Sequence, residues 1–384
     1  MQVNETQIIE DLQAMIRIPS VNPDLDPDGT GEAEIAQWLQ TWCVSRGLKT
    51  QLQMSAPNRP NLIARWEGKG DGKSILLTGH TDTVSVKNMD IDPFDSRIED
   101  GRMYGRGSYD MKAGLASILG AVDALQASDF QPAGDIILAF VTDEEYASIG
   151  TSKLVEEVHA DAAILTEPTE TQLCIAHKGF AWITLETEGR AAHGSRYDLG
   201  TDAILHMNRL LTFIERLETD ILVNKTHPLL ARPSVHASGI EGGLGWSTFP
   251  ERCVLKVEHR LLPDETGETY LAMWQGEIQR LMQADPKFSA TATLELARPG
   301  YEIPRESPIV RATERAFQKV MGKPPTYYGM WAWLDSAILG PAGIPTVILG
   351  AGGAGAHAAV EYVELAEVFH CAEIIAETVH SWTA

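Results

Sequence analysis

The chain has 384 residues, of which 44% are hydrophobic and 22% charged, a composition that excludes disordered, collagen-like and low-complexity proteins. Its 53 acidic residues outnumber its 31 basic residues and give a net charge of −22, and no cluster of lysine and arginine is long enough to follow a phosphate backbone. We therefore expect neither nucleic acid nor an anionic membrane as a partner.

The cysteines and the N-terminal residues indicate the compartment. The four cysteines have no CxxC spacing, so we expect buried thiols in a reducing environment rather than a disulfide framework or a thiolate zinc site. The opening residues lack a basic segment followed by an apolar one, and no window approaches the roughly 18 apolar residues of a membrane span. These features predict a cytoplasmic protein.

The first half of the chain reads as an α/β domain. An apolar stripe from Ile8 to Ile16 predicts a helix that Pro19 brings to an end. Short apolar runs then alternate with helical patterns, which is typical of a sheet flanked by helices. The expected strands are 61–66, 74–77, 135–141 and 162–165, and the expected helices are 111–125 and 152–157.

After about residue 177 the pattern changes to strict alternation. Strands at 181–187, 234–240, 252–261 and 290–296 and helices at 202–217 and 268–284 follow the order β-α-β-β-α-β, which is typical of a self-contained small domain. The α/β pattern resumes with a helix at 308–321, a strand at 344–349 and a helix at 363–382. We predict one domain from residues 1–178 and 297–384, interrupted by an inserted domain from residues 179–296.

The sharpest motif is Gly79-His80-Thr81-Asp82 at a predicted strand end. On an extended backbone His80 and Asp82 point the same way, so one side chain can bind a metal while the other fixes the imidazole. A strand-end pair of this kind is, by itself, more often a satisfied polar pair.

Two glycine-rich segments resemble nucleotide-binding loops, but neither fits that role. In the segment from Gly105 to Gly114, Asp110 occupies the place of the last glycine, and its carboxylate would repel a pyrophosphate. The sequence GxGxxG from Gly350 to Gly355 lies too close to the C-terminus for a complete βαβ unit, so we expect a close-approach loop after a strand.

More carboxylates and a second histidine follow other predicted strands. Glu144 and Glu145 come after the strand at 135–141, Glu167 follows the strand at 162–165, and His357 follows the last glycine loop. The adjacent acidic residues alone indicate a solvated loop. Together with His80 and Asp110, however, this set suits zinc or a similar divalent ion, and a carboxylate bridging two ions about 3.5 Å apart is a two-metal arrangement used for hydrolysis.

Six motifs carry a resemblance that spans nearly the whole chain. GHTDTV, GRGSYDMKAG, TDEE, LTEPT, AAHGS and GAHAAVEYV resemble, in order, the signature set of the dinuclear zinc aminoacylase and carboxypeptidase family, which includes acetylornithine deacetylase, succinyl-diaminopimelate desuccinylase and glutamate carboxypeptidase. The resemblance implies a zinc-exopeptidase-like three-layer α/β catalytic domain with an inserted ferredoxin-like α+β lid through which two chains form a homodimer.

The resemblance also implies the metal ligands. It implies two Zn²⁺ per chain, with Co²⁺ or Mn²⁺ as substitutes. One ion would be bound by His80, Asp110 and Glu167, and the other by Asp110, Glu145 and His357, with Asp110 bridging.

Further roles follow from the same resemblance. Glu144 matches the general base, Asp82 would orient His80, and His193 on the lid matches the histidine that stabilises the tetrahedral oxyanion across a dimer. The alternative for His193 is a surface imidazole.

Substrate contacts are implied for three places. Arg260 matches a lid arginine for the substrate carboxylate, although an interior ion pair is the alternative. The backbone N–H groups of Gly352 and Gly353 would also face that carboxylate. Ser247 stands where the family usually has asparagine, which puts the usual substrate in doubt because a hydroxyl reaches less far.

Trp331 and Trp333 are a second departure from the family pattern, explained either by packing or by an aromatic wall for an acyl group.

We predict a metal-dependent amidohydrolase that cleaves an N-acyl amino acid by attack of a metal-bridging hydroxide. The alternative is a dipeptidase or carboxypeptidase of the same family. A non-catalytic module would have lost some of these residues, and a serine hydrolase is poorly supported because no GxSxG occurs.

Overall fold

The computed structural model describes residues 1–384, which fold into two compact units. Unit 1 comprises residues 1–175, 303–328 and 334–384, and unit 2 comprises residues 176–302 and 329–333. The predicted insertion, residues 179–296, lies within unit 2. The unit boundaries fall a few residues outside the predicted ones, and the short segment 329–333 was not predicted to belong to the inserted domain.

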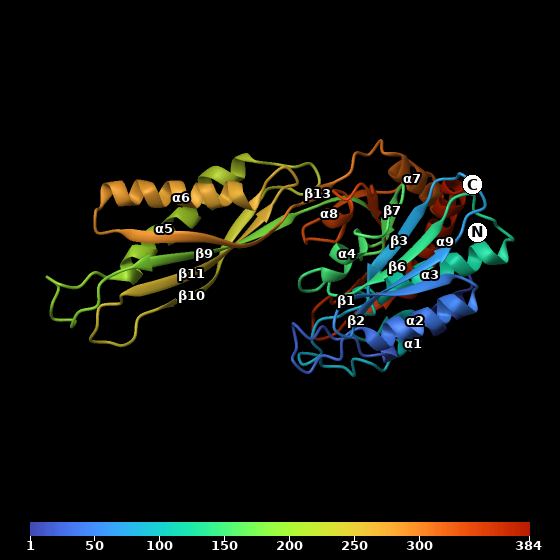
Figure 1. Ribbon diagram of the computed structural model, residues 1–384, viewed down its shortest axis with the longest axis horizontal. Coiled ribbons are helices and arrows are strands. Elements are labelled where there is room, and N and C mark those ends of the chain that lie inside the picture. The colour runs from blue at the N-terminus through green and yellow to red at the C-terminus, as the bar shows by residue number, and fades with distance from the viewer. The chain divides into compact units, whose positions relative to one another are not determined.

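Unit 1 is built on a mixed sheet in the order β1-β2-β6-β3-β7-β15-β8. Figure 1 labels β1, β2, β6, β3 and β7 of this sheet. β3 runs parallel to β6 and β7, and β7 runs parallel to β15. The central strands β3 and β6 are buried along their whole length, which explains their continuous apolar sequences. The strands are β1 (Lys49–Ala56), β2 (Arg59–Trp66), β3 (Ile75–His80), β6 (Ile136–Val141), β7 (Ala163–Leu165), β8 (Leu173–His177) and β15 (Thr346–Ile348).

Helices cover both faces of this sheet, so the predicted α/β class is confirmed. α3 packs on β3 and against α1 and α9. On the other face, Leu154 of α4 and Leu339 of α8 join a core with Leu76 and Ile137 of the sheet. The helices of unit 1 are α1 (Glu5–Arg17), α2 (Ala33–Ser45), α3 (Lys112–Ala127), α4 (Ile149–Leu154), α7 (Pro308–Met321), α8 (Ser336–Leu339) and α9 (Leu365–Trp382).

A second, small sheet in unit 1 was not predicted. Its order is β16-β17-β5-β4, and its register pairs Val363 with Met103. It joins the segment before Asp110 to the segment after His357. Its strands are β4 (Ile98–Glu99), β5 (Arg102–Tyr104), β16 (Gly353–Ala354) and β17 (Tyr362–Glu364).

Unit 2 contains a four-stranded antiparallel sheet in the order β10-β11-β9-β12. Helices α5 and α6 cover one face, where Trp274 and Tyr270 are fully buried in the core. The chain order is the expected β-α-β-β-α-β. Its elements are β9 (Gly179–Glu188), α5 (Ala203–Arg216), β10 (Ser234–Gly242), β11 (Arg252–Leu261), α6 (Gly267–Ala284) and β12 (Ser289–Arg298).

Two short strands lie near the boundaries between the units. β13 (Tyr301–Glu302) pairs with residues 176 and 177, and β14 (Tyr327–Met330) also pairs with β8. No helix in the chain combines the length and apolarity that crossing a bilayer requires. All four cysteines are buried and form no disulfide.

Candidate functional site

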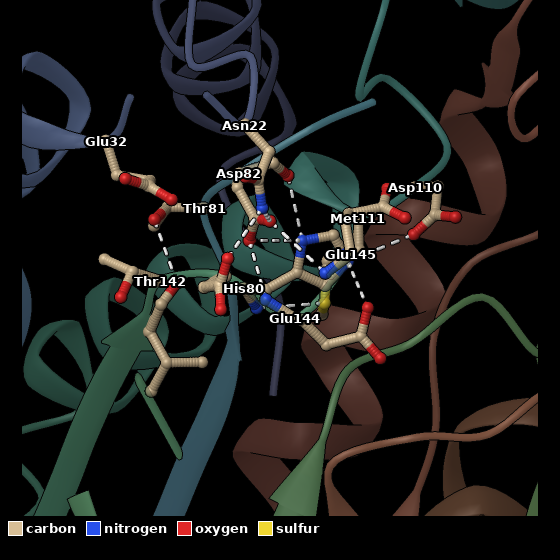
Figure 2. Close-up of polar contacts among 12 residues, drawn as sticks. Asn22, Glu32, His80, Thr81, Asp82, Asp110, Met111, Thr142, Glu144 and Glu145 are labelled. Atoms are coloured by element: carbon tan, nitrogen blue, oxygen red, sulfur yellow. Dashed lines mark hydrogen bonds and ion pairs between the residues drawn. The ribbon is translucent and has the colours of Figure 1, made fainter. Parts of the chain in front are cut away.

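Three neighbouring strand ends build the candidate site. β6, β3 and β7 are adjacent and parallel, so their carboxyl ends meet at one edge of the sheet. His80 is the last residue of β3, the pair Glu144 and Glu145 follows β6, and Glu167 follows β7. Asp110 enters this edge from the turn before α3 (Figure 2).

Asp110 lies between the two histidines. Its Oδ1 is 3.2 Å from His80 Nε2, and its Oδ2 is 3.5 Å from His357 Nε2. His357 comes from the loop between β16 and β17, and its Nε2 also lies 2.9 Å from Glu145 Oε2. Each oxygen of Asp110 therefore faces a different imidazole, as a bridging ligand requires.

The remaining carboxylates lie around His80. Its Nε2 is 3.9 Å from Glu144 Oε2 and 3.9 Å from Glu167 Oε1. Two groups of ligand-type side chains, His80 with Glu144 and Glu167, and His80 with Asp110 and Glu145, each place their donor atoms within 4.8 Å of one another. The structure thus brings together in unit 1 all five side chains predicted as metal ligands.

The donor set fits divalent cations. Glu145 Oε1 and Glu167 Oε1 are buried without a hydrogen-bond partner, which is costly for a carboxylate unless a cation compensates. Burial and the nearby carboxylate of Glu167 raise the pKa of Glu144 well above its ordinary value, and burial also raises the pKa of Glu167. Imidazole nitrogens together with carboxylate oxygens suit zinc, cobalt or manganese.

Asp82 contacts both His80 and the loop after β6. His80 Nδ1 is 2.9 Å from the backbone carbonyl oxygen of Asp82 and 3.5 Å from its carboxylate. That carboxylate accepts hydrogen bonds from the backbone N–H groups of Glu144, at 3.1 Å, and Glu145, at 3.2 Å. Asp82 therefore positions the acidic loop as well as the imidazole (Figure 2).

Asn22 is a buried site residue that sequence reasoning missed. Its Nδ2 donates to Asp82 Oδ2 at 2.8 Å and to Asp143 Oδ1 at 3.0 Å. Arg59 Nη1 lies 2.9 Å from the same oxygen of Asp143. Asn22 stands between the end of the first helix and a proline, where nothing in the sequence distinguishes it from a turn residue.

Glu361 was also missed as a site residue. Its Oε1 accepts from the backbone N–H groups of Tyr109, at 2.9 Å, and Asp110, at 3.0 Å, and its Oε2 accepts from Arg106 at 2.7 Å. This buried carboxylate holds the turn that presents Asp110. The signal was available, because Glu361 and Arg106 both lie within the motifs that carry the resemblance.

Three predicted residues lie in unit 2. His193 is in an exposed loop, where its Nδ1 is 2.8 Å from Ser195 Oγ. Ser247 is exposed nearby, and its carbonyl oxygen accepts from Gly194 N at 2.7 Å. Arg260 lies on β11, where its Nη2 is 2.9 Å from Glu258 Oε1. Their roles remain predictions.

The predicted glycine loop is closely packed. Gly352 accepts a hydrogen bond from Glu364 N at 2.9 Å, and a Cβ added to it would lie 2.3 Å from Glu367 Oε2. Gly353 belongs to β16 and pairs with Val363. That the N–H groups of these glycines bind substrate remains a prediction.

Comparison with known proteins decides the family. Residues 76–381 match peptidase family M20/M25/M40. The chain belongs to this family. The resemblance found in the motifs is thereby confirmed, and the chain is a hydrolase with a candidate metal-binding site.

Relatives align along almost the whole chain. A deformylase of N-formyl-4-amino-5-aminomethyl-2-methylpyrimidine from Halalkalibacterium halodurans is 26% identical over 405 residues, covering 97% of this chain and 94% of the relative. An acetylornithine deacetylase from Salmonella heidelberg is 28% identical over 383 residues, covering 97% of both chains. The crystal structure of aminopeptidase PepT from Bacillus cereus has the same fold, with a TM-score of 0.84, 21% identity and complete coverage of both chains.

Proposed function

We propose that this M20 hydrolase removes the acyl group from an N-acyl amino acid with the help of two divalent cations, zinc first among them. The observation that carries the proposal is the placement of Asp110 between His80 and His357. Two buried carboxylates in the same cluster, those of Glu145 and Glu167, each have one oxygen, Oε1, without a hydrogen-bond donor. When bound, two such cations act as Lewis acids on the amide carbonyl and make water a stronger nucleophile at neutral pH.

Different side chains bind the cations and transfer the proton. In this proposal His80, Asp110 and Glu167 would hold one cation, and Asp110, Glu145 and His357 would hold the other. Glu144 lies in the same cluster, and we assign it the proton transfers: it takes a proton from the attacking water and delivers it to the nitrogen as the C–N bond breaks. The products are the free carboxylic acid and the amine of the amino acid.

The proposed substrate class is supported by Arg260 and by the names of the relatives. A planar guanidinium suits the carboxylate of an amino acid, and Arg260 is only partly covered on β11. Relatives named as a deformylase and a deacetylase support removal of a short acyl group. A dipeptide is the alternative substrate, because the fold is shared with aminopeptidase PepT.

The arrangement of unit 2 supports a homodimer. Arg260 pairs with Phe180 at one end of the sheet, whereas Arg252 pairs with Glu188 at the other end, beyond which lie His193 and Ser247. Eight residues of strand separate these ends, which is about 27 Å. A small amide cannot contact Arg260 and His193 of the same chain, so we propose that His193 serves the site of a second copy.

An exposed apolar patch lies at the same end of unit 2. Leu244 and Trp246 lie in the loop that precedes Ser247 and are essentially fully exposed, as is Tyr197 in the loop that contains His193. Exposed large apolar side chains gathered in this way are typical of protein interfaces. The patch therefore supports an interface at the end of the molecule that carries His193.

A panel of N-acetyl, N-succinyl and N-benzoyl amino acids, formamides and dipeptides tests the proposal. Chelated protein should be inactive, and activity should return with zinc, cobalt or manganese. Glu144→Gln should keep its metal content and lose about 10²-fold to 10⁴-fold in kcat, the usual contribution of general acid–base catalysis. Glu99→Gln, which changes an exposed carboxylate, is the matched control.

Each result has a defined meaning. Near-native turnover by metal-loaded Glu144→Gln would remove Glu144 from the proton transfers. Cleavage of dipeptides alone would replace the deacylase with a peptidase. A wild-type protein that binds two metals but cleaves nothing in the panel would overturn the substrate class.

A further inference from the structure

The face of the unit 2 sheet opposite α5 and α6 carries an aromatic cluster. Side chains on β9 alternate, so Phe180 and Trp182 point to this open face while Ala181 and Ile183 face the core. Their rings lie 5.2 Å apart between centroids. Trp333 meets Phe180 edge to face at 6.2 Å, and its Nε1 donates to the carbonyl oxygen of Pro299.

Cationic side chains flank this cluster on the neighbouring strands. Arg260 of β11 and Arg298 of β12 are both paired in register with Phe180, and the Arg260 guanidinium lies 5.9 Å from the Phe180 ring. Lys178 directly precedes β9, and its ammonium lies 5.0 Å from the ring of Trp331, which stands two residues before Trp333 in the chain. Glu258 neutralises part of this charge through its contact with Arg260. Glu258 also accepts a hydrogen bond from Trp182 Nε1, and Glu295 lines the groove beside that ring. The cationic part of the cluster is therefore its Phe180 end, where the Arg260 guanidinium suits a carboxylate.

None of these rings belongs to the hydrophobic core of unit 2. Trp331 is 62% exposed and Trp182 is 43% exposed, whereas Trp274 on the covered face is fully buried. Trp182 also borders a groove of about 640 Å³, whose lining includes Ser238 and Lys256. A cavity of this size and with this mixture of apolar and polar groups is typical of a small-molecule site.

We propose that Phe180, Trp182, Trp331 and Trp333, called here the aromatic platform, bind an aromatic ring of the amide substrate while Arg260 pairs with its carboxylate. This inference rests on the proposed function and narrows it to N-acyl amino acids that carry a flat ring. A substrate ring can pack on these side chains in an offset-stacked or edge-to-face arrangement. The adjacent guanidinium supplies the positive charge that pairs with a carboxylate. The platform thus determines specificity and takes no part in the proton transfers.

The ring can lie on either side of the amide bond, and two probes distinguish the cases. N-benzoylalanine carries the ring on the acyl side, N-acetylphenylalanine carries it on the amino-acid side, and N-acetylalanine has none. Trp182→Leu should lower kcat/KM for one or both ring-bearing probes by about ten-fold and leave N-acetylalanine within about two-fold. Trp182→Phe should retain most of the ring preference, and Trp331→Leu should lose part of it.

The matched control is Glu186→Ala, which removes a side chain from the same face of β9 outside the platform. Equal losses for ring-bearing and ring-free probes would overturn the proposal, because they indicate a structural role. A shift in oligomeric state of Trp182→Leu on size-exclusion chromatography, with unchanged ring preference, would assign the face to a second copy instead.

Direct binding separates this inference from the proposed function. Calorimetric titration of the chelated protein with N-benzoylalanine and N-acetylphenylalanine measures ring binding without turnover. Tighter binding of at least one of them than of N-acetylalanine, lost in Trp182→Leu, supports the platform even if the metal-loaded enzyme hydrolyses neither. Equal binding of all three compounds would overturn the platform even if the enzyme is an active deacylase.

Discussion

At the scale of single residues, the buried amide of Asn22 supports the metal-binding cluster through Asp82. Its amide is the side-chain donor that links two buried carboxylates, Asp82 and Asp143. Asn22→Leu removes two hydrogen bonds to charged groups, so we expect a loss of about 2–3 kcal/mol in the free energy of unfolding. Because Asp82 also holds the loop of Glu144 and Glu145, metal affinity should fall about 10-fold to 100-fold.

Urea unfolding of the chelated protein and competition for zinc with a chelator measure the two effects separately. Asn208→Leu replaces an exposed asparagine on α5 and is the control for the change of side chain. Unchanged zinc affinity in Asn22→Leu would show that Asp82 holds the acidic loop without help from Asn22.

The residues at strand ends could be predicted from the sequence, whereas their supports could not. His80, Glu145 and Glu167 follow recognisable apolar strands, so the meeting of parallel strand ends was enough to group them. Asn22 and Glu361 act through contacts that span 60 residues or more of chain. No local pattern encodes such a contact, and a polar residue in a turn looks the same whether it is buried or solvated.

At the scale of secondary-structure elements, the close approach of α3 to β7 positions Glu167. A Cβ added to Gly114 on α3 would lie 2.1 Å from the carbonyl oxygen of Thr166, the residue before Glu167. Gly114→Ala therefore forces α3 and the end of β7 apart, and overpacking of this kind costs about 1–3 kcal/mol. We expect a lower midpoint of thermal unfolding and weaker zinc binding.

Gly276 on α6 offers a matched control, since nothing lies within 4 Å of a Cβ added there. Gly276→Ala should stabilise the protein by about 0.5–1 kcal/mol through helix propensity alone. Opposite signs for the two substitutions would support the packing argument. A neutral or stabilising Gly114→Ala would mean that α3 does not need this close approach.

Most elements with a strong period were predicted, and elements without one were missed. The helix α2 (Ala33–Ser45) is an exception, because it was missed although its buried residues Ile35, Leu39 and Trp42 recur at helical spacing. The strand at 252–261 and the helix at 308–321 have the bounds expected from the sequence. β1 is a polar edge strand with few buried residues, and the strands of the small sheet have only two or three residues, too few to show alternation. The helix expected at 152–157 is α4, Ile149–Leu154, displaced toward the N-terminus.

At the scale of the whole molecule, a buried neutral histidine makes stability sensitive to acid. Burial lowers the pKa of His259 in unit 2 from 6.5 to about 3, and Trp274 donates a hydrogen bond to its Nε2. Below about pH 6.5 this histidine is protonated in the unfolded chain but stays neutral in the folded chain. As the pH falls, its contribution therefore lowers the free energy of unfolding by about 1.4 kcal/mol per pH unit. Burial lowers the pKa of His177 in the same direction, to about 4.

His259→Gln isolates this contribution, because glutamine can accept the hydrogen bond from Trp274 without titrating. Urea unfolding between about pH 7 and pH 5 should give a shallower loss of stability for the variant, with a difference in slope near 1.4 kcal/mol per pH unit below pH 6.5. Parallel slopes would show that His259 is protonated in the folded protein or becomes accessible to water.

If His193 acts on the site of a second chain, mixing two inactive variants should restore a defined fraction of the activity. A chain with His193→Ala keeps Glu144, and a chain with Glu144→Ala keeps His193. If His193 serves the partner's site, a mixed dimer has one site with both residues and one with neither. Random exchange of equal amounts makes half of the dimers mixed, so about a quarter of all sites should be active, although each variant alone is nearly inactive.

Recovery to about a quarter of wild-type kcat after mixing supports this arrangement. Activity that stays at the level of the separate variants, with subunit exchange verified by mass, would place His193 outside the partner's site.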